Sequence, residues 1–358
     1  MNIRTAGAAL RQNGRLAALF SGPLSFGLVL LFLHPEGMSD PARAALAVTA
    51  WVALWWITEA VEIEVTALLP LVLLPLTGAM KIGPSAQAYG NPLVFLYLAG
   101  FVLAIAIERW ELHRRIALHI ILAIGTGSRQ LVLGFMLATA VISMWISNTA
   151  TALMMMPIAM AVIRQFSKTD ALGKLIPTPF SQALVLGVAY AASIGGMATM
   201  IGTPPNLVFA GVVRETYGIE FSFVQWMIAA LPLASILLLL TWYYLVHAGF
   251  KVGADVGIGS SDALREQLRS LGPMQPEEKR VLAVFTCAAV AWIIRGFVLQ
   301  PLIPALDDTI VGLLGALALF FIPAPSQPGE RLMNWKHAVK MPWGILLIFG
   351  GGLALADS

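Results

Sequence analysis

The sequence predicts an all-α membrane protein that crosses the bilayer several times and contains one re-entrant helical hairpin and one broken helix. Hydrophobic residues make up 58% of its 358 residues, charged residues make up 11%, and the mean hydropathy is +0.82. A soluble domain is typically about 25% charged. Apolar runs of a length suited to a hydrocarbon core of about 30 Å recur along the chain. Two longer uncharged stretches are interrupted by small polar residues, glycines and prolines.

The apolar runs are candidate transmembrane segments, some of them short enough to need tilting or extension by their flanks. The first run has no small-residue cleavage pattern behind it, so we expect it to be retained as a span and not removed as a signal peptide. The candidate spans are Leu16–Leu33, Ala45–Thr58, Val65–Leu76, Pro92–Ile107, Phe223–His247, Val281–Leu299, Ile310–Ile322 and Trp343–Ala356.

The distribution of Lys and Arg predicts a cytoplasmic N-terminus. With that orientation most basic residues fall in cytoplasmic loops, and only Arg43, Lys81 and Arg214 fall in loops on the other side. Cytoplasmic loops of membrane proteins carry such an excess of Lys and Arg. The net charge of +3 therefore reflects membrane topology, and we expect no nucleic-acid partner.

The first interrupted stretch, residues 130–163, predicts a re-entrant hairpin. Its 34 uncharged residues are too many for one straight span and too few for two crossings, which need roughly 40 residues. Both flanks, Arg129 and Arg164, are basic, so both ends are expected on the cytoplasmic side. The Ser147-Asn148-Thr149 cluster lies near the middle and is expected at the tip. Non-helical backbone at that depth must be buried in protein or line a cavity.

The second interrupted stretch, residues 175–213, predicts a transmembrane helix that is broken over 181–213. Pro204-Pro205 removes two amide donors and cannot lie inside a continuous helix. The preceding glycines permit backbone geometries that other residues resist. We expect the first half to end near Ile201, an unwound bridge over 202–206, and a second half that starts at Leu207.

Together the two polar breaks suit an anion and a small cation. Half-helix N-termini offer N–H groups and partial positive charge, whereas unwound carbonyls and side-chain oxygens suit Na⁺. One competing interpretation is that the hydroxyl groups merely cap helix ends. Another is an intramembrane hydrolase with Ser147 as nucleophile, but no His, Lys, Asp or Glu lies between Gln130 and Ile163 to act as its base. No ATP-binding motif is present, which favours secondary over primary transport.

At these residues the sequence resembles the divalent anion/sodium symporter family, which includes the sodium-coupled di- and tricarboxylate carriers. The matching segments are "SMWISNTATALMMMPIA", "GGMATMIGTPPNLVFAG" and "AWVALWWITEAVEIEVTALLPLVLLPLTG", and the resemblance covers nearly the whole chain. A Ser-Asn-Thr tip followed by a Gly-Thr-Pro-Pro-Asn bridge is a specific pair. The resemblance implies an inverted-repeat secondary transporter, a homodimer in the plasma (inner) membrane whose transport domain moves like an elevator, with no organic cofactor.

The resemblance also implies a function and roles for individual residues. The function is sodium-coupled symport of a C4-dicarboxylate such as succinate or malate. A sodium-independent anion exchanger and a sulfate or tartrate carrier of the same fold stay open as alternatives. Substrate contact would fall to Ser147, Asn148 and Thr149, with Thr203, Pro204 and Pro205 closing the pocket, and Na⁺ would be held by Ser143, Ser147, Asn148 and the backbone of Gly202.

With these roles the chain divides into consecutive parts. The family has two inverted repeats, and "FGGGLALADS" at residues 349–358 aligns with "AGFVLAIAIE" at 99–108. We therefore expect a second repeat that is incomplete and a chain that is a C-terminally truncated fragment. The expected parts are a cytoplasmic N-terminus (1–15), scaffold-type transmembrane helices (16–108), a first transport unit (109–222), a transmembrane helix (223–248), a cytoplasmic amphipathic loop (249–280) and the start of the second repeat (281–358).

Several charged and reactive residues lie outside this scheme. Glu62 and Glu64 fall where a cytoplasmic turn is expected and are either solvated carboxylates or gating groups. Arg295 lies inside a predicted span, close enough to its end to extend its charge toward the interface, and it is otherwise a functional candidate. Cys287 is the single cysteine, which excludes an internal disulfide, and the five histidines are scattered, so no metal cluster is expected.

Overall fold

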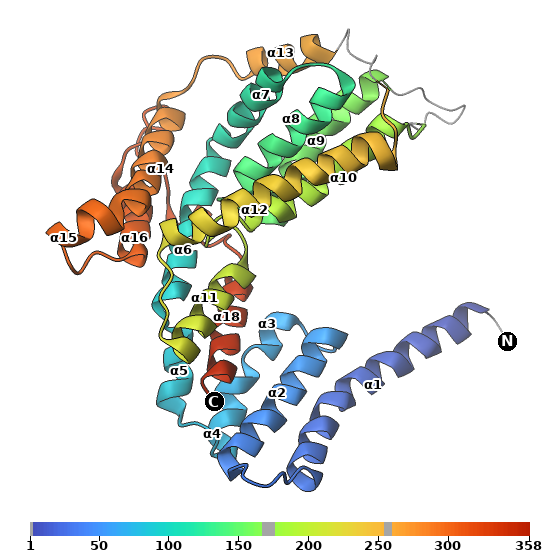
Figure 1. The fold of residues 1–358 in the computed structure, drawn as a ribbon, viewed down its shortest axis with the longest axis vertical. Coiled ribbons are helices and arrows are strands. Elements are labelled where there is room, and N and C mark those ends of the chain that lie inside the picture. Colours follow the sequence, from blue (N-terminus) through green and yellow to red (C-terminus); the bar gives the residue numbers. More distant parts are fainter. Residues whose placement is uncertain (1–2, 167–175, 254–259) are drawn as a thin grey trace. The chain divides into compact units, whose positions relative to one another are not determined.

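The computed structural model describes residues 3–166, 176–253 and 260–358 (Figure 1). Across these residues the chain forms helices joined by turns, with no β-strand and one isolated bridge between Pro323 and Arg331. The predicted all-α fold is therefore confirmed. The chain divides into two compact units, each assembled from segments that are distant in sequence.

Several helices have the length and apolar composition of membrane spans. Among the described residues, four are long enough to cross by themselves: Gly14–Phe32, Ile82–Arg109, Phe223–Gly249 and Pro276–Leu302. Shorter apolar helices include the two that flank the predicted hairpin tip. The helix before the tip has 16 residues and is about 24 Å long, less than a hydrocarbon core of about 30 Å.

The first unit comprises Met1–Phe95, Val208–Glu220 and Pro342–Ser358. The predicted span Val65–Leu76 is divided here into two short helices, with Pro70 in the first turn of the second, where its missing N–H is tolerated. Its elements are α1 (Ile3–Phe32), α2 (Asp40–Thr58), α3 (Ile63–Thr66), α4 (Leu69–Thr77), α5 (Ile82–Tyr89), the beginning of α6 (Pro92–Arg109), most of α11 (Pro204–Tyr217) and α18 (Trp343–Ala356).

Close helix packing holds this unit together. Helices α1 and α2 pair, and Trp55 Nε1 donates a hydrogen bond to Leu19 O at 3.1 Å. Helix α18 contacts α3, α4 and α5 through its glycines. A Cβ on Gly351 would lie 2.5 Å from the Ala67 carbonyl oxygen, so only glycine permits this approach. Glu62 precedes α3 and Glu64 lies in its first turn, and both side chains are exposed.

The second unit comprises Leu96–Leu207 and Phe221–Met341. Its longest helices begin with side-chain caps or proline, as for Ser222, whose hydroxyl accepts the Gln225 N–H. Its elements are the rest of α6, α7 (Leu112–Ile124), α8 (Ser128–Ser143), α9 (Asn148–Phe166), α10 (Pro179–Gly196), the start of α11, α12 (Phe223–Tyr243) with a π-helical end (Tyr244–Gly249), α13 (Ser260–Ser270), α14 (Pro276–Ile294) with a π-helical end (Arg295–Leu299), α15 (Gln300–Leu302), α16 (Asp308–Phe321) and α17 (Trp335–Ala338).

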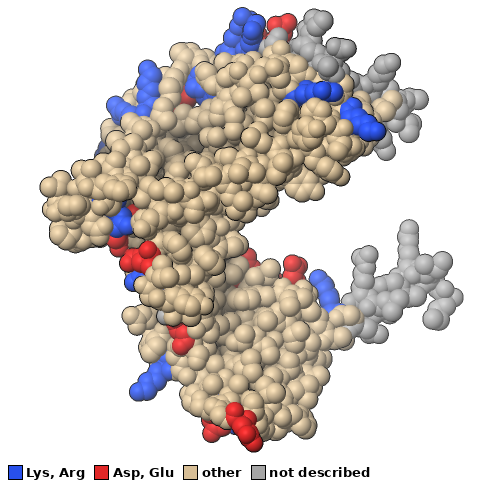
Figure 2. All heavy atoms as spheres, viewed as in Figure 1, with Lys and Arg blue, Asp and Glu red and all other residues tan. Residues whose placement is uncertain are grey.

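Helix α10 packs against α8, α9 and α12, which places the predicted hairpin beside the first half of the broken helix (Figure 1). The amphipathic segment forms α13 and packs on α7 and α9, with Leu264 fully buried and Leu268 half-buried. Lys and Arg side chains gather near α13 at one end of this unit (Figure 2). That distribution matches the basic loops expected on a cytoplasmic face.

Candidate functional site

Two interruptions of helical structure form the candidate site in the second unit. The first, residues 144–147, joins α8 to α9 and, together with Asn148 and Thr149 at the start of α9, is called the tip; the second, residues 197–203, joins α10 to α11 and is called the bridge. The first half of the broken helix ends at Gly196, earlier than the predicted Ile201, and the second begins at Pro204, where a proline suits the first helical position.

The tip presents the N-terminus of α9 together with polar side chains. Ser147 Oγ accepts a hydrogen bond from the Ala150 N–H at 3.3 Å, so this hydroxyl does cap the helix. Asn148 is half-buried, and Thr149 is exposed. The first N–H groups of a 19-residue helix carry partial positive charge. The tip is therefore accessible and electrostatically suited to an anion.

Behind the tip lie three oxygen atoms that share one hydroxyl hydrogen. Ser143 Oγ lies 2.6 Å from the Ala192 carbonyl oxygen and 2.9 Å from Asn148 Oδ1. A hydroxyl has a single hydrogen and can donate to only one of these acceptors at a time. Ser143 is fully buried and Ala192 almost so. A small cation, which accepts oxygen lone pairs from all three groups, fits this arrangement.

Asn206 holds the bridge in shape. Its side-chain amide donates to the Gly196 carbonyl at 2.9 Å and to the Thr199 carbonyl at 2.7 Å. Both amide hydrogens are thus used on backbone carbonyls that have left the regular helix. Sequence analysis placed Asn206 in the bridge motif but gave it no role. An amide side chain directly after Pro-Pro in an apolar run is the sequence feature that could have predicted this role for Asn206.

The tip and the bridge contact each other directly. The Thr199 hydroxyl donates to the Met144 carbonyl. A Cβ on Gly196 would fall 2.3 Å from Asn148 Oδ1, and one on Gly195 would fall 2.3 Å from the Ala140 carbonyl oxygen. Two adjacent glycines therefore let α10 approach the hairpin closely enough to place the bridge beside Asn148.

The predicted site residues separate into two groups. Ser143, Ser147, Asn148 and Thr149 all lie at the tip or in the turn before it. Gly202 lies against the Gly196 carbonyl, because a Cβ added to Gly202 would fall 2.5 Å from that oxygen. The glycine that lies next to Asn148 is Gly196. Thr203 and Pro204 are half-buried and Pro205 is exposed at the start of α11. The sequence pattern predicts no ligand role for Ala192, Gly196 or Thr199.

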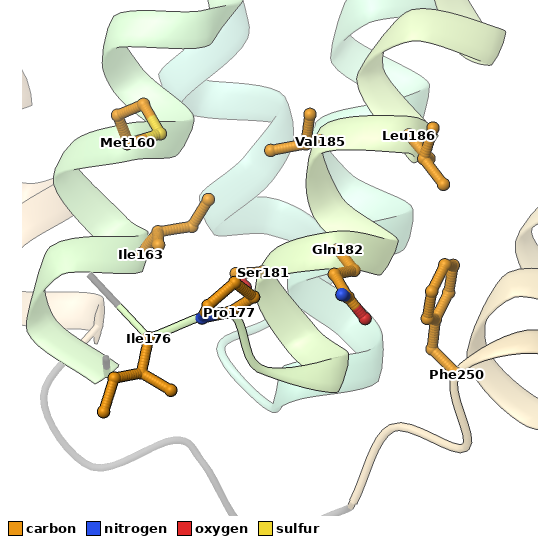
Figure 3. Close-up of a pocket in the computed structure, with 9 residues that line it drawn as sticks. All are labelled: Met160, Ile163, Ile176, Pro177, Ser181, Gln182, Val185, Leu186 and Phe250. Atoms are coloured by element: carbon orange, nitrogen blue, oxygen red, sulfur yellow. The ribbon is translucent and has the colours of Figure 1, made fainter. Parts of the chain in front are cut away.

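A separate cavity of about 410 Å³ lies between α9, α10 and the segment that follows α12 (Figure 3). Its polar lining groups, Ser181 and Gln182, belong to the first turn of α10. The nine lining residues carry no charge and none belongs to the tip or the bridge. A cavity with a mostly apolar, uncharged lining does not suit a divalent anion, so the tip remains the candidate site.

Arg295 forms a buried ion pair. Its Nε lies 2.7 Å from Asp308 Oδ1 without the alignment of a hydrogen bond, and both side chains are about one-tenth exposed. The partner comes from the first turn of α16. Arg295 therefore has a charge partner within the protein.

Comparison with known proteins identifies a family of sodium-coupled anion carriers, in agreement with a site suited to an anion and a small cation. Residues 15–358 match the family model described as the sodium:sulfate symporter transmembrane region. The chain is 42% identical over 353 residues to the sodium-dependent dicarboxylate transporter SdcS of Staphylococcus saprophyticus, and 41% identical over 348 residues to SdcS of Staphylococcus aureus strain USA300. Each alignment covers 96% of this chain and 67% of the relative.

Proposed function

Because this chain belongs to the sodium:sulfate symporter transmembrane family, we propose that it carries a C4-dicarboxylate across the membrane together with Na⁺. It is a multi-pass membrane transporter and not an enzyme, which leaves the intramembrane hydrolase without support. The relatives at 41–42% identity are named for dicarboxylate, whereas the family description names sulfate. The observation that carries the proposal is the group of three oxygens behind the tip.

In the proposed mechanism Na⁺ binds first. Ser143, Ser147 and Asn148 supply side-chain oxygens, and the backbone near Gly202 completes the site, as the family resemblance implies. The nearby Ala192 carbonyl supports this assignment, because it lies 2.6 Å from Ser143 Oγ. Bound Na⁺ adds a positive charge next to the N-terminus of α9, so both attract the dianion.

Substrate then binds over the ion. Ser147, Asn148 and Thr149 contact one carboxylate, and Thr203, Pro204 and Pro205 close the pocket from the bridge side. Both carboxyl groups of succinate or malate are ionised at neutral pH, because a typical carboxyl pKa is about 4. We further propose a homodimer with a cytoplasmic N-terminus, in which residues 130–163 form a re-entrant hairpin that moves with its cargo.

The test is uptake of labelled succinate into proteoliposomes with an inward Na⁺ gradient, or with choline replacing Na⁺. Wild type is expected to accumulate succinate only with Na⁺. Ser147→Ala and Asn148→Ala are expected to abolish this uptake, and Ser181→Ala, a cap at the far end of α10, to retain it. Uptake at wild-type rates in either tip variant would contradict the assignment.

Competition defines the substrate class. Unlabelled malate is expected to inhibit succinate uptake at lower concentration than tartrate or sulfate. Stronger inhibition by sulfate would favour the sulfate carrier, and equal uptake in choline would favour sodium-independent exchange.

A further inference from the structure

An aromatic side chain of the tip is inserted into a cluster outside the hairpin. Trp145 is half-buried and stacks on Phe223 of α12, with ring centroids 5.9 Å apart and an angle of 19° between the planes. It also lies 6.3 Å from Trp292 and meets Phe285 edge-on at 4.9 Å, both on α14. Such offset and edge-to-face arrangements are favourable. The tip thus contacts α12 and α14, two helices outside the hairpin.

The cluster itself is held rigidly. Phe223 and Trp292 are almost fully buried and stack on each other at 4.7 Å with an angle of 11°. Asp308 connects both of them: its Oδ2 accepts the Phe223 N–H at 2.8 Å, and its carbonyl accepts Trp292 Nε1 at 2.8 Å. The same carboxylate pairs with Arg295. The aromatic surface under Trp145 therefore has a fixed position.

The first turn of α12 contacts both interruptions. Phe223 meets the tip through Trp145, and Trp226, one turn later, donates from Nε1 to the Met197 carbonyl of the bridge at 3.0 Å. Residues three apart lie on the same side of a helix. One end of α12 thus contacts the tip through an aromatic stack and the bridge through a hydrogen bond.

We infer that Trp145 is a positioning residue for ion and substrate binding. Its indole seats the tip on Phe223 and Trp292, so that Asn148 keeps its distance from Ser143 and the bridge. Trp145 is two residues before Ser147 and contacts apolar rings, so it acts through the tip backbone and not as a ligand. This inference rests on the proposed function for its transport readout, but the position of the tip can be measured independently.

The first experiment compares Na⁺ activation of succinate uptake in Trp145→Leu, Trp145→Phe and wild type. Trp145→Leu is expected to raise the Na⁺ concentration for half-maximal uptake about three- to tenfold, as expected for loss of one or two aromatic pairs. Trp145→Phe keeps a ring and is expected to restore most of the affinity. Trp335→Leu, which removes an exposed tryptophan beyond the other end of α16, is the matched control.

A purely structural role predicts a different pattern. Trp145→Leu would then lower the amount of folded transporter or its maximal rate and leave the half-saturating Na⁺ concentration unchanged. That outcome, or equal effects of the Leu and Phe variants on Na⁺ affinity, would overturn the inference.

The second experiment does not depend on which solute is carried. In a Cys287→Ala background, Thr149→Cys places a single thiol on the exposed side of the tip, and its alkylation by a water-soluble maleimide is timed. Trp145→Leu is expected to change this rate at least about threefold, while Trp335→Leu leaves it unchanged. An unchanged rate in Trp145→Leu refutes the positioning role. Absence of Na⁺-dependent uptake by wild type refutes only the proposed function.

Discussion

At the residue scale, two hydroxyl groups on α8 differ in where they form hydrogen bonds, one within its own helix and one with other helices. Thr139 Oγ1 donates to the Phe135 carbonyl four residues earlier, at 2.6 Å, which satisfies the hydroxyl within its own helix. Ser143, one turn later, instead reaches Ala192 on α10 and Asn148 on α9. Capping and back-bonding account for Thr139 and Ser147, whereas the Ser143 hydroxyl contacts two other helices, as we propose for an ion ligand.

Ser143→Ala is expected to weaken Na⁺ binding specifically. It removes one of the three oxygens, the hydroxyl oxygen that lies within hydrogen-bond distance of both Ala192 O and Asn148 Oδ1. We expect the half-saturating Na⁺ concentration for succinate uptake to rise about tenfold. Thr139→Val, which deletes a hydroxyl that is satisfied within its helix, is the control and should stay near wild type. Equal Na⁺ affinities in the two variants would exclude Ser143 as an ion ligand.

Gly196→Ala tests the close contact between bridge and tip. The added methyl group would fall 2.3 Å from Asn148 Oδ1, so the asparagine or the bridge must move. We expect uptake to fall by about tenfold or more, because a small displacement of a binding group has large effects. Gly27→Ala adds the same methyl group to α1, where no atom lies within 4 Å, and should retain transport. Uptake at normal rate in Gly196→Ala would show that Asn148 does not need its observed position.

At the element scale, one ion pair connects α7 with the start of α14. Arg115 Nε lies 2.6 Å from Glu278 Oε2 and its Nη2 lies 3.2 Å from Oε1, in a two-pronged geometry. A further guanidinium nitrogen donates to the Gly272 carbonyl at 3.0 Å, just after α13. The arginine thus joins three helices, and the pair is largely buried, with 13% and 8% of the two side chains exposed.

Arg115→Met is expected to lower the stability of the second unit. The substitution keeps most of the apolar stem but leaves Glu278 buried without its charge partner, a change that costs about 3–5 kcal/mol. Arg114→Met removes the neighbouring arginine, whose pair with Glu111 is exposed, and should have little effect. The midpoint of thermal unfolding in detergent, measured from the onset of aggregation, distinguishes Arg115→Met from Arg114→Met. Similar midpoints for both variants would show that the buried pair contributes nothing.

At the scale of the whole molecule, the chain forms two compact units, each built from segments that are distant in sequence. The first takes its N-terminal helices together with parts near residues 208–220 and 342–358, and the second takes the segments between them. Lys and Arg side chains gather near α13 in the second unit (Figure 2), and the excess of basic residues in cytoplasmic loops predicts that this end faces the cytoplasm.

Accessibility of single cysteines tests this orientation. In the Cys287→Ala background, Glu36→Cys lies in the exposed turn between α1 and α2, and Ser270→Cys lies at the exposed end of α13. With a cytoplasmic N-terminus, an impermeant maleimide added to intact cells should label Glu36→Cys and leave Ser270→Cys unlabelled until the cells are opened. The reverse pattern would invert the predicted topology.

Features that depend on local pattern were predictable from sequence. Composition and apolar runs identify a helical membrane protein because every backbone polar group in a bilayer must be satisfied within the protein. Pro204-Pro205 and its glycines locate a helix break to within a few residues, since proline cannot donate and glycine tolerates close approach. The polar tip was likewise identifiable, because a Ser-Asn-Thr cluster interrupts an otherwise apolar stretch.

Contacts between distant segments were decided only by the tertiary structure. Ser143 meets Ala192 across 49 residues, and Asp308 meets Phe223 across 85. The third oxygen of the group is the backbone carbonyl of Ala192, which accepts from Ser143 and which no side-chain pattern reveals. Arg295 looked like a lone membrane cation because its partner lies on another helix. Sequence by itself determined which segments are apolar and where they break, since these are local properties. The packing of helices determined which groups meet at the breaks.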